Sequence, residues 1–272
     1  MPVQLNRSRM PVIIAGLIFT ASGWTVLWTT QTFWNPLAFT TLWTGAALLM
    51  WEASEGGYPG IRRHALLALL SVPLWWWFEL VNTRTENWQY IHPFEYEPLQ
   101  YAVLSSAAFA TVAPVLVAAT SFITTLTSRT SQPATKPSSS FAWWEIALGA
   151  VMQAGVFIFP AQLYPLVWVA PFLVIDGLLA RMGGGSLAAD LMRGKWRAAV
   201  TIGLAGLLCG MLWEFWNYWS TPKWIYHVPL LGFAKVFEMP LLGYGGYMPF
   251  AWSIMQFVRL LDTLKDRVKE GI

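Results

Sequence analysis

Long apolar runs separated by short polar segments extend over most of the chain. Eight such runs are visible, and several hold about 20 residues, enough to cross a hydrocarbon core of ~30 Å as a helix. Gly, Pro and charged residues concentrate in the segments between them. The pattern predicts an all-α polytopic membrane protein with about eight transmembrane helices. The predicted spans are residues 11–30, 36–51, 65–82, 99–126, 141–159, 163–180, 198–217 and 241–261.

A segment rich in Ser, Thr and Pro, residues 129–140, lies between the fourth and fifth runs and lacks hydrophobic periodicity. It divides the chain into residues 1–128 and 141–272, with four predicted spans on each side. We therefore expect two four-helix membrane repeats joined by a cytoplasmic linker. Because each half has an even number of spans, both enter the membrane in the same orientation. This arrangement is a parallel repeat about an axis along the membrane normal.

Composition supports a membrane protein and excludes several other classes. Hydrophobic residues make up 56% of the chain and charged residues only 11%, which is unlike a soluble domain. Basic residues lie at the ends of the runs rather than in one patch, so we expect no nucleic-acid partner. The single cysteine, Cys209, lies inside an apolar run, so we expect no disulfide and no cysteine metal cluster. The sequence leaves the oligomeric state open.

The distribution of positive charge predicts the orientation in the membrane. With the N-terminus inside, only Arg84, Lys223 and Lys235 fall on outer segments. Since Lys and Arg favour the cytoplasmic side, we expect both termini in the cytoplasm and the chain in the cell membrane. The basic residues on the inner segments are Arg7, Arg9, Arg62, Arg63, Arg129, Lys136, Arg181, Arg193, Lys195, Arg197, Arg259, Lys265, Arg267 and Lys269.

Two predicted spans end in an acid followed three residues later by an amide. Glu79 and Asn82 end the third run, and Glu214 and Asn217 end the seventh. Residues three apart share one helix face. An acid at the end of a membrane span is costly and indicates a functional site. The two Glu are separated by the same interval as the two Asn, which indicates a duplicated unit with half of a site in each copy.

The outer loops that follow these pairs also match each other. The interval that separates the two Glu also separates His92 from His227, and a Trp-x-Tyr element occurs in both loops one residue out of register. Both elements fall on the same side of the membrane in the predicted topology. We therefore expect the two loops to complete a single binding site. The residues expected to bind substrate are Trp88, Tyr90, His92, Glu95, Trp224, Tyr226, His227 and Glu238.

Paired buried carboxylates suit general acid–base chemistry. Desolvation and like charge both disfavour two ionised groups, so one acid holds a proton while the other accepts one. We expect Asn82 and Asn217 to donate hydrogen bonds to Glu79 and Glu214 and to fix their rotamers. The surrounding aromatic rings stabilise cations, including the carbocation formed when an acid protonates an alkene. These four residues are the predicted catalytic set.

These elements resemble the repeat of the small membrane lycopene β-cyclases, over about residues 77–101 and 213–244. The first copy is Glu79/Asn82, Trp88-x-Tyr90 and Phe94-Glu95-Tyr96-Glu97-Pro98, and the second is Glu214/Asn217, Trp224-x-Tyr226 and Phe237-Glu238-Met239-Pro240. Here Pro98 and Pro240 follow the acids, whereas in that family the proline precedes them. The resemblance implies acid–base cyclisation or isomerisation of an isoprenoid or carotenoid lipid. We expect no cofactor and no metal.

Other interpretations of the same residues remain open. The two Glu also suit a lipid or small-molecule transporter with a proton-titratable site between the repeats. A non-catalytic subunit of a membrane complex, with the Glu as a structural clamp, is a further alternative. His92 and His227 together with the two Glu form a metal-ligand set in principle, but their spacing does not support one. Asp176 is interpreted as structural, with Arg181 as its partner.

Overall fold

The computed structural model describes residues 9–127, 133–229 and 232–270. Two of the basic residues counted above, Arg7 and Arg129, lie outside the described residues, as do residues 129–132 of the predicted linker. Before the linker the chain forms α1 (Met10–Thr29), α2 (Asn35–Glu52), α3 (Ile61–Thr85), β1 (Trp88–Ile91), α4 (Pro98–Phe109) and α5 (Val112–Leu126). After it come α6 (Ser139–Ile158), α7 (Pro160–Leu163), α8 (Leu166–Arg181), α9 (Leu187–Met192), α10 (Arg197–Tyr218), β2 (Lys223–Tyr226), β3 (Lys235–Val236), β4 (Met239–Pro240), the 3₁₀ helix η1 (Leu241–Gly246) and α11 (Tyr247–Glu270).

The predicted helical character is confirmed, and several helices suit a membrane. In the described part of the chain, five helical stretches are long and apolar enough to cross a bilayer by length and composition. They are α1, α3, the stretch Pro98–Leu126 formed by α4 and α5, α6 and α10. These stretches coincide with five of the eight predicted spans. The other three stay predictions: they fall on α2, on α8 with the residues just before it, and on η1 followed by α11.

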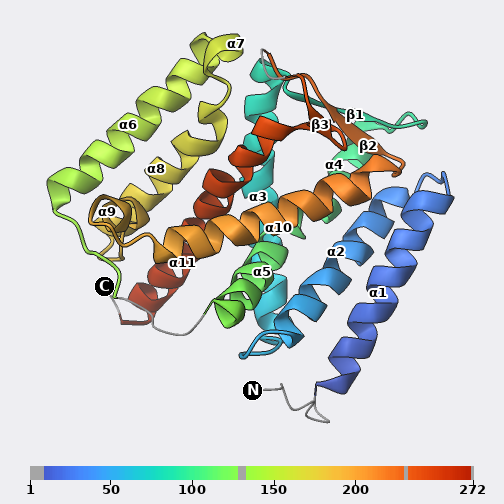
Figure 1. Ribbon diagram of the computed structural model, residues 1–272, viewed down its shortest axis with the longest axis horizontal. Helices are drawn as coiled ribbons and strands as arrows, with labels where there is room; N and C mark the ends of the chain where they lie inside the picture. The colour runs from blue at the N-terminus through green and yellow to red at the C-terminus, as the bar shows by residue number, and fades with distance from the viewer. Residues whose placement is uncertain (1–8, 128–132, 230–231, 271–272) are drawn as a thin grey trace.

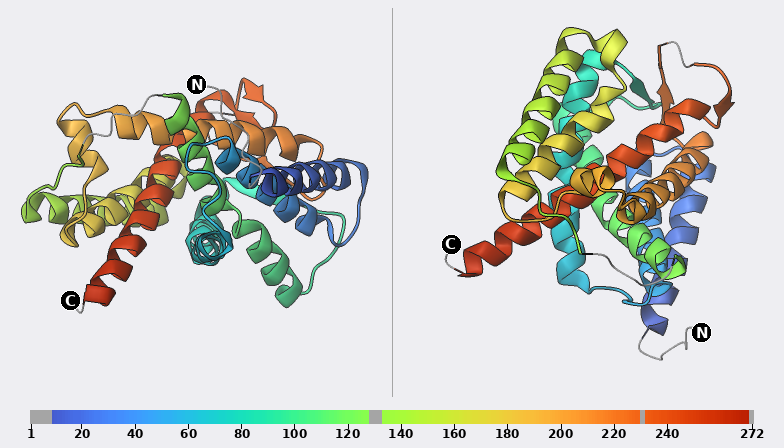
Figure 2. Two further views of the ribbon diagram at one scale, coloured as in Figure 1. Left: turned by 90° about the horizontal axis from the view of Figure 1, so that it is seen from below. Right: turned by 60° about the vertical axis from the view of Figure 1, so that its left-hand side comes forward.

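Two tightly packed helix pairs lie on opposite flanks of the molecule (Figure 1). The α1–α2 pair depends on Gly23, where an added Cβ would lie 2.5 Å from the backbone nitrogen of Leu42. In the α6–α8 pair, an added Cβ at Gly149 would lie 2.8 Å from the Ala170 carbonyl oxygen. Small residues allow such close backbone approach where lipid gives little drive for helices to associate. Helices α3, α5, α10 and α11 fill the space between the pairs (Figure 2).

The fourth predicted span is not one continuous helix. It breaks between Phe109 and Val112, because Pro114 has no N–H to donate to the preceding turn. Ser71 of α3 fills the gap, where its hydroxyl donates to the Phe109 carbonyl at 2.5 Å and accepts from the Ala113 N–H at 3.0 Å. The break therefore places Phe109 against the segment of α3 that leads to Glu79.

The connections that follow α3 and α10 contain short strands where the sequence predicted only irregular segments. Strands β1 and β2 pair antiparallel, with Trp88 opposite Tyr226 and Tyr90 opposite Trp224. The strands form because two short loops from distant parts of the chain satisfy each other's backbone groups, and the chain remains mostly helical. The pairing is symmetric, since the Trp of each strand faces the Tyr of the other. The strands lie beyond the ends of α3 and α10 (Figure 1).

Asp176 is structural, as predicted, but its partner is not Arg181. Its carboxylate accepts hydrogen bonds from the Leu187 N–H at 2.9 Å, the Ala188 N–H at 3.0 Å and the Ser186 hydroxyl at 2.8 Å. Arg181 instead donates to the Ser139 hydroxyl. The predicted ion pair is wrong because the start of α9 presents free backbone N–H groups to this carboxylate. Asp176 thus fixes the connection between α8 and α10.

Candidate functional site

The Glu79 carboxylate lies at the end of α3 among three side-chain donors. Its Oε1 atom accepts from Trp75 Nε1 at 2.8 Å, Trp88 Nε1 at 3.2 Å and the Tyr90 hydroxyl at 2.7 Å. Trp75 reaches it from one helical turn earlier, at the i, i+4 spacing. Trp88 and Tyr90 reach it from strand β1. The strand therefore covers the acid and supplies two of its three hydrogen bonds.

The Glu214 carboxylate lies in the corresponding place at the end of α10. Its Oε1 atom accepts from the hydroxyls of Tyr226 and Tyr247, each at 2.7 Å, and from Trp224 Nε1 at 3.4 Å. Glu214 is 0% exposed. Its other oxygen, Oε2, is buried without a hydrogen-bond partner among the described residues. Such an atom is costly to bury.

The two Asn side chains bind backbone rather than carboxylate. Asn82 donates from Nδ2 to the Trp88 carbonyl at 2.8 Å, and its Oδ1 accepts from the Trp88 N–H at 3.2 Å. Asn217 makes the same two bonds to Trp224, at 2.7 and 2.8 Å. The expectation that the amides orient the Glu side chains is therefore wrong. A two-stranded ladder leaves these backbone groups unpaired, and the amides satisfy them and position both indoles.

The one-residue offset between the two Trp-x-Tyr elements comes from an extra residue in the second copy. The interval from Trp88 to Trp224 is one residue longer than the interval between the two Glu, yet both indoles take the same place over their Glu. The extra residue lies after Asn217 in the second copy. By this register the counterpart of His92 is Val228 rather than the neighbouring His. The matched interval of the two His is therefore a coincidence and does not reflect equivalent positions.

One apolar cavity of about 430 Å³ lies between the two carboxylate sites. Both strands and helices from both halves of the chain contribute to its wall, and none of its lining residues is Lys, Arg, Asp or Glu. Its aromatic lining is Phe39, Trp75, Trp88, Tyr90, Tyr96, Tyr101, Phe109, Tyr164, Trp168, Trp213, Trp224, Tyr226, Tyr247 and Phe250. The cavity therefore suits a lipophilic molecule, and its ring faces suit positive charge.

Stacked rings give this wall a defined shape. The Trp168 ring stacks on Phe78 with centroids 5.3 Å apart and on Trp88 with centroids 5.9 Å apart. The Trp213 ring stacks on Tyr247 at 5.9 Å. Such contacts restrict the rotation of large side chains. The wall is therefore built before any ligand binds.

The structure brings five of the predicted binding residues to this cavity. They are Trp88, Tyr90, His92, Trp224 and Tyr226. The predicted catalytic residues Glu79, Glu214, Asn82 and Asn217 are not part of the lining, because the indoles and phenols bonded to them stand in front.

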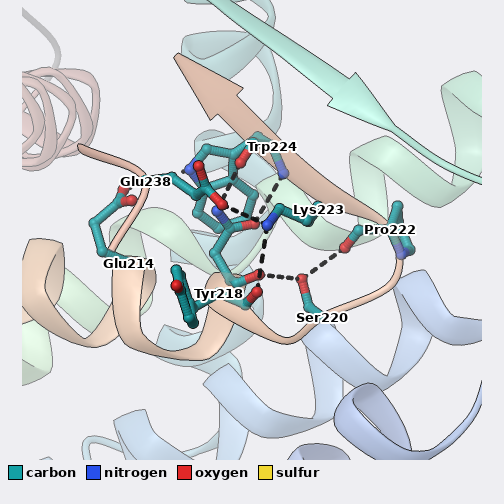
Figure 3. A network of polar contacts seen from close by, with 8 residues as sticks. Glu214, Tyr218, Ser220, Pro222, Lys223, Trp224 and Glu238 are labelled. Atoms are coloured by element: carbon teal, nitrogen blue, oxygen red, sulfur yellow. Dashed lines mark hydrogen bonds and ion pairs between the residues drawn. The ribbon is translucent and has the colours of Figure 1, made fainter. Parts of the chain in front are cut away.

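The remaining predicted binding residues lie outside the lining. Glu95 and His227 are exposed, and the His227 N–H donates to the Asn87 carbonyl at 2.9 Å. Glu238 forms an ion pair with Lys223 on the outer side of β2, and Lys223 also donates to the Tyr218 carbonyl at 3.3 Å (Figure 3). Lys223 and Glu238 therefore pair at the rim, and neither is part of the lining of the apolar cavity.

Sequence reasoning missed two donors and one glycine. Trp75 and Tyr247 each give a carboxylate its third hydrogen bond. Gly210 stands four residues before Glu214, as Trp75 stands four before Glu79. A Cβ at Gly210 would lie 2.3 Å from the Tyr247 ring. The absence of a side chain at position 210 therefore makes room for the Tyr247 phenol.

The strand phenols keep their protons near neutral pH. Burial raises the pKa of Tyr90 and of Tyr226 well above the ordinary value, and the charge of the adjacent Glu raises each further. Both phenols therefore stay hydrogen-bond donors to the carboxylates. In the described residues, no three His, Cys, Asp or Glu side chains are grouped as a metal site.

Comparisons with family models, with curated proteins and with solved structures gave no match to this chain.

Proposed function

We propose that the protein is a membrane-embedded enzyme that cyclises or isomerises a lipophilic isoprenoid by acid–base chemistry. The observation that carries this proposal is one aromatic cavity with a carboxylate behind each of two walls, half-buried at Glu79 and fully buried at Glu214. Each carboxylate is hydrogen-bonded to a phenol that faces the cavity, Tyr90 on one side and Tyr226 on the other. Apolar walls bind the ligand, and a buried acid supplies the proton.

The proposed reaction begins with proton addition to a carbon–carbon double bond. The π electrons form the new C–H bond, and a carbocation remains on the neighbouring carbon. Ring faces such as those of Trp88, Trp168 and Trp224 stabilise this charge. The cation then attacks a second double bond or loses a proton from an adjacent carbon. A carboxylate takes that proton back, so the product has the same mass as the substrate.

The proposal includes a placement in the membrane. Eight spans form two parallel repeats, with both termini in the cytoplasm and the strands at the outer face. The excess of basic residues on the predicted inner segments supports this orientation. The apolar surfaces of the five candidate spans support burial in lipid. A lipid substrate would then enter from the outer leaflet.

Mass spectrometry of total isoprenoid lipids tests the proposal. Cells express the wild type, Glu79→Gln or Glu214→Gln at equal levels. We expect a lipid of unchanged mass and shifted retention time with the wild type, and its loss with at least one variant. Thr83→Ala, on the exposed outer end of α3, is the matched control. If wild-type cells show no altered lipid but accumulate one on one side of the membrane, the protein is a transporter instead.

A further inference from the structure

The two carboxylates differ in how they reach the cavity. Glu79 contacts two indoles and one phenol, whereas Glu214 contacts two phenols and one indole. An indole N–H does not exchange its proton readily, but a phenol O–H does, because its oxygen both donates and accepts. Glu214 is therefore better connected for proton transfer to a bound ligand.

A paired exchange of residues produces this difference. The interval from Phe94-Glu95 to Phe237-Glu238 equals the interval from Tyr101 to Tyr244. By the same interval Leu104 corresponds to Tyr247, and both line the cavity. Trp75 and Leu104 in one half are thus replaced by Gly210 and Tyr247 in the other. The small residue and the phenol complement each other, since the Tyr247 ring occupies the space that a side chain at position 210 would fill.

Complete burial of Glu214 favours its neutral acid, although three donors face its Oε1 atom. An ionised carboxylate in a buried site needs donors at both oxygens, and Oε2 has none among the described residues. A proton on Oε1 instead donates to the Tyr247 oxygen and leaves Oε2 as an uncharged carbonyl. The hydrogen of Tyr247 is then free to point into the cavity. The Tyr226 hydroxyl, 3.5 Å from that of Tyr247, still donates to Oε1.

We propose that Glu214 is the proton donor of the cavity and that Tyr247 is a catalytic residue that passes its proton to the ligand. The inference rests on the proposed function and assigns its acid. In one step the Tyr247 O–H proton bonds to an alkene carbon through the π electrons. The phenol oxygen keeps its electron pair and takes the proton of Glu214, which becomes a carboxylate. The ligand cation balances that charge, and the reverse transfer restores the acid. Glu79 holds strand β1 in place.

Infrared spectroscopy of the purified protein tests this inference without a substrate. We expect the difference spectrum between the wild type and Glu214→Gln to contain the stretching band of one protonated carboxyl group, and the difference spectrum between the wild type and Glu79→Gln to lack it. Tyr247→Phe should shift the band, because the acid loses its hydrogen-bond acceptor. Tyr244→Phe is the control, since the Tyr244 hydroxyl donates to the Val236 carbonyl at 3.1 Å and is not part of the lining. A band lost in Glu79→Gln alone, or unmoved by Tyr247→Phe, would overturn the assignment.

Lipid conversion provides the second measurement. Tyr247→Phe should lower product formation about 100-fold or more, as expected for a residue in general acid catalysis, while Tyr244→Phe should stay within about 2-fold of the wild type. If Tyr247 were only structural, its variant would lose thermal stability and activity together. If the wild type forms no product, the proposed function fails, and the infrared result alone decides whether Glu214 holds an exchangeable proton.

Discussion

The Glu79 and Glu214 sites share one arrangement of an Asn and a strand Trp-x-Tyr, called here the shared frame. They differ in the third side chain that donates a hydrogen bond to the carboxylate. In both, an Asn three residues after the acid binds the backbone of a strand Trp, and the strand places an indole and a phenol over the carboxylate. The third donor differs: Trp75 comes from the same helix as its acid, whereas Tyr247 comes from a different one. The comparison indicates that the frame positions two strands and that the chemistry lies in the exchanged residues.

The largest expected effect is a loss of stability when the space at Gly210, which the Glu79 site lacks, is filled by a side chain. Gly210→Trp should lower the free energy of unfolding by about 3 kcal/mol or more, because its side chain overlaps the Tyr247 ring. Adding Tyr247→Leu should restore most of that loss, since the pair then matches Trp75 and Leu104. Thermal unfolding in detergent measures both. Gly245→Ala is the control, because nothing lies within 4 Å of its added Cβ. A stable single variant would refute the packing argument.

The second largest expected effect is a loss of stability when either Asn of the shared frame is removed. Asn82→Ala and Asn217→Ala each leave a backbone N–H and carbonyl of the strand Trp without a partner, at an expected cost of about 2 kcal/mol. The cost should be greater at Asn217, which is 1% exposed, than at the partly exposed Asn82. Chemical unfolding of the purified variants measures the difference. Equal stability of both variants and the wild type would show that the strands do not depend on the amides.

Removal of the hydroxyl of Tyr90 or Tyr226 should cost less stability, and the two variants should differ. Tyr90→Phe removes one hydrogen bond from Glu79, at a cost of about 1 kcal/mol. Tyr226→Phe removes the bond to Glu214 and also the acceptor of Trp224 Nε1, 2.8 Å away. We therefore expect the Tyr226 variant to be the less stable by about 1 kcal/mol. Paired melting curves measure this difference, and the reverse order would contradict the hydrogen-bond assignment.

The smallest expected effect on stability comes from the Lys223–Glu238 ion pair at the rim of the cavity. The Lys223–Glu238 pair is partly exposed, with side chains 28% and 17% accessible, so Lys223→Met should cost about 0–1 kcal/mol. Glu95, the counterpart of Glu238, is exposed, and Glu95→Gln should have no measurable effect. Unfolding at low and high salt distinguishes the two, since salt should reduce only the Lys223 effect. A large loss would mean that the rim pair supports the cavity.

Local spacing made part of this site predictable. Glu79 with Asn82 and Glu214 with Asn217 were recognisable because three residues make nearly one helical turn. Trp88-x-Tyr90 and Trp224-x-Tyr226 were recognisable because alternate residues of an extended segment share a face. The broken fourth span was not predicted although Pro114 lies in it, and only the structure shows that the gap is filled by the hydroxyl of Ser71, which belongs to the preceding predicted span.

The sequence by itself determined that the chain is mostly helical and apolar, and that it carries two acid–amide pairs each followed by a Trp-x-Tyr. Only the tertiary structure decided that β1 pairs with β2, that the amides hold backbone, and that Tyr247 bonds to Glu214. The physical reason is that sequence patterns report on residues close together in the chain, whereas these contacts join residues far apart in it. Periodicity records which residues share a face of one element, whereas a vacant position such as Gly210 gains meaning only when the side chain that fills its space is known.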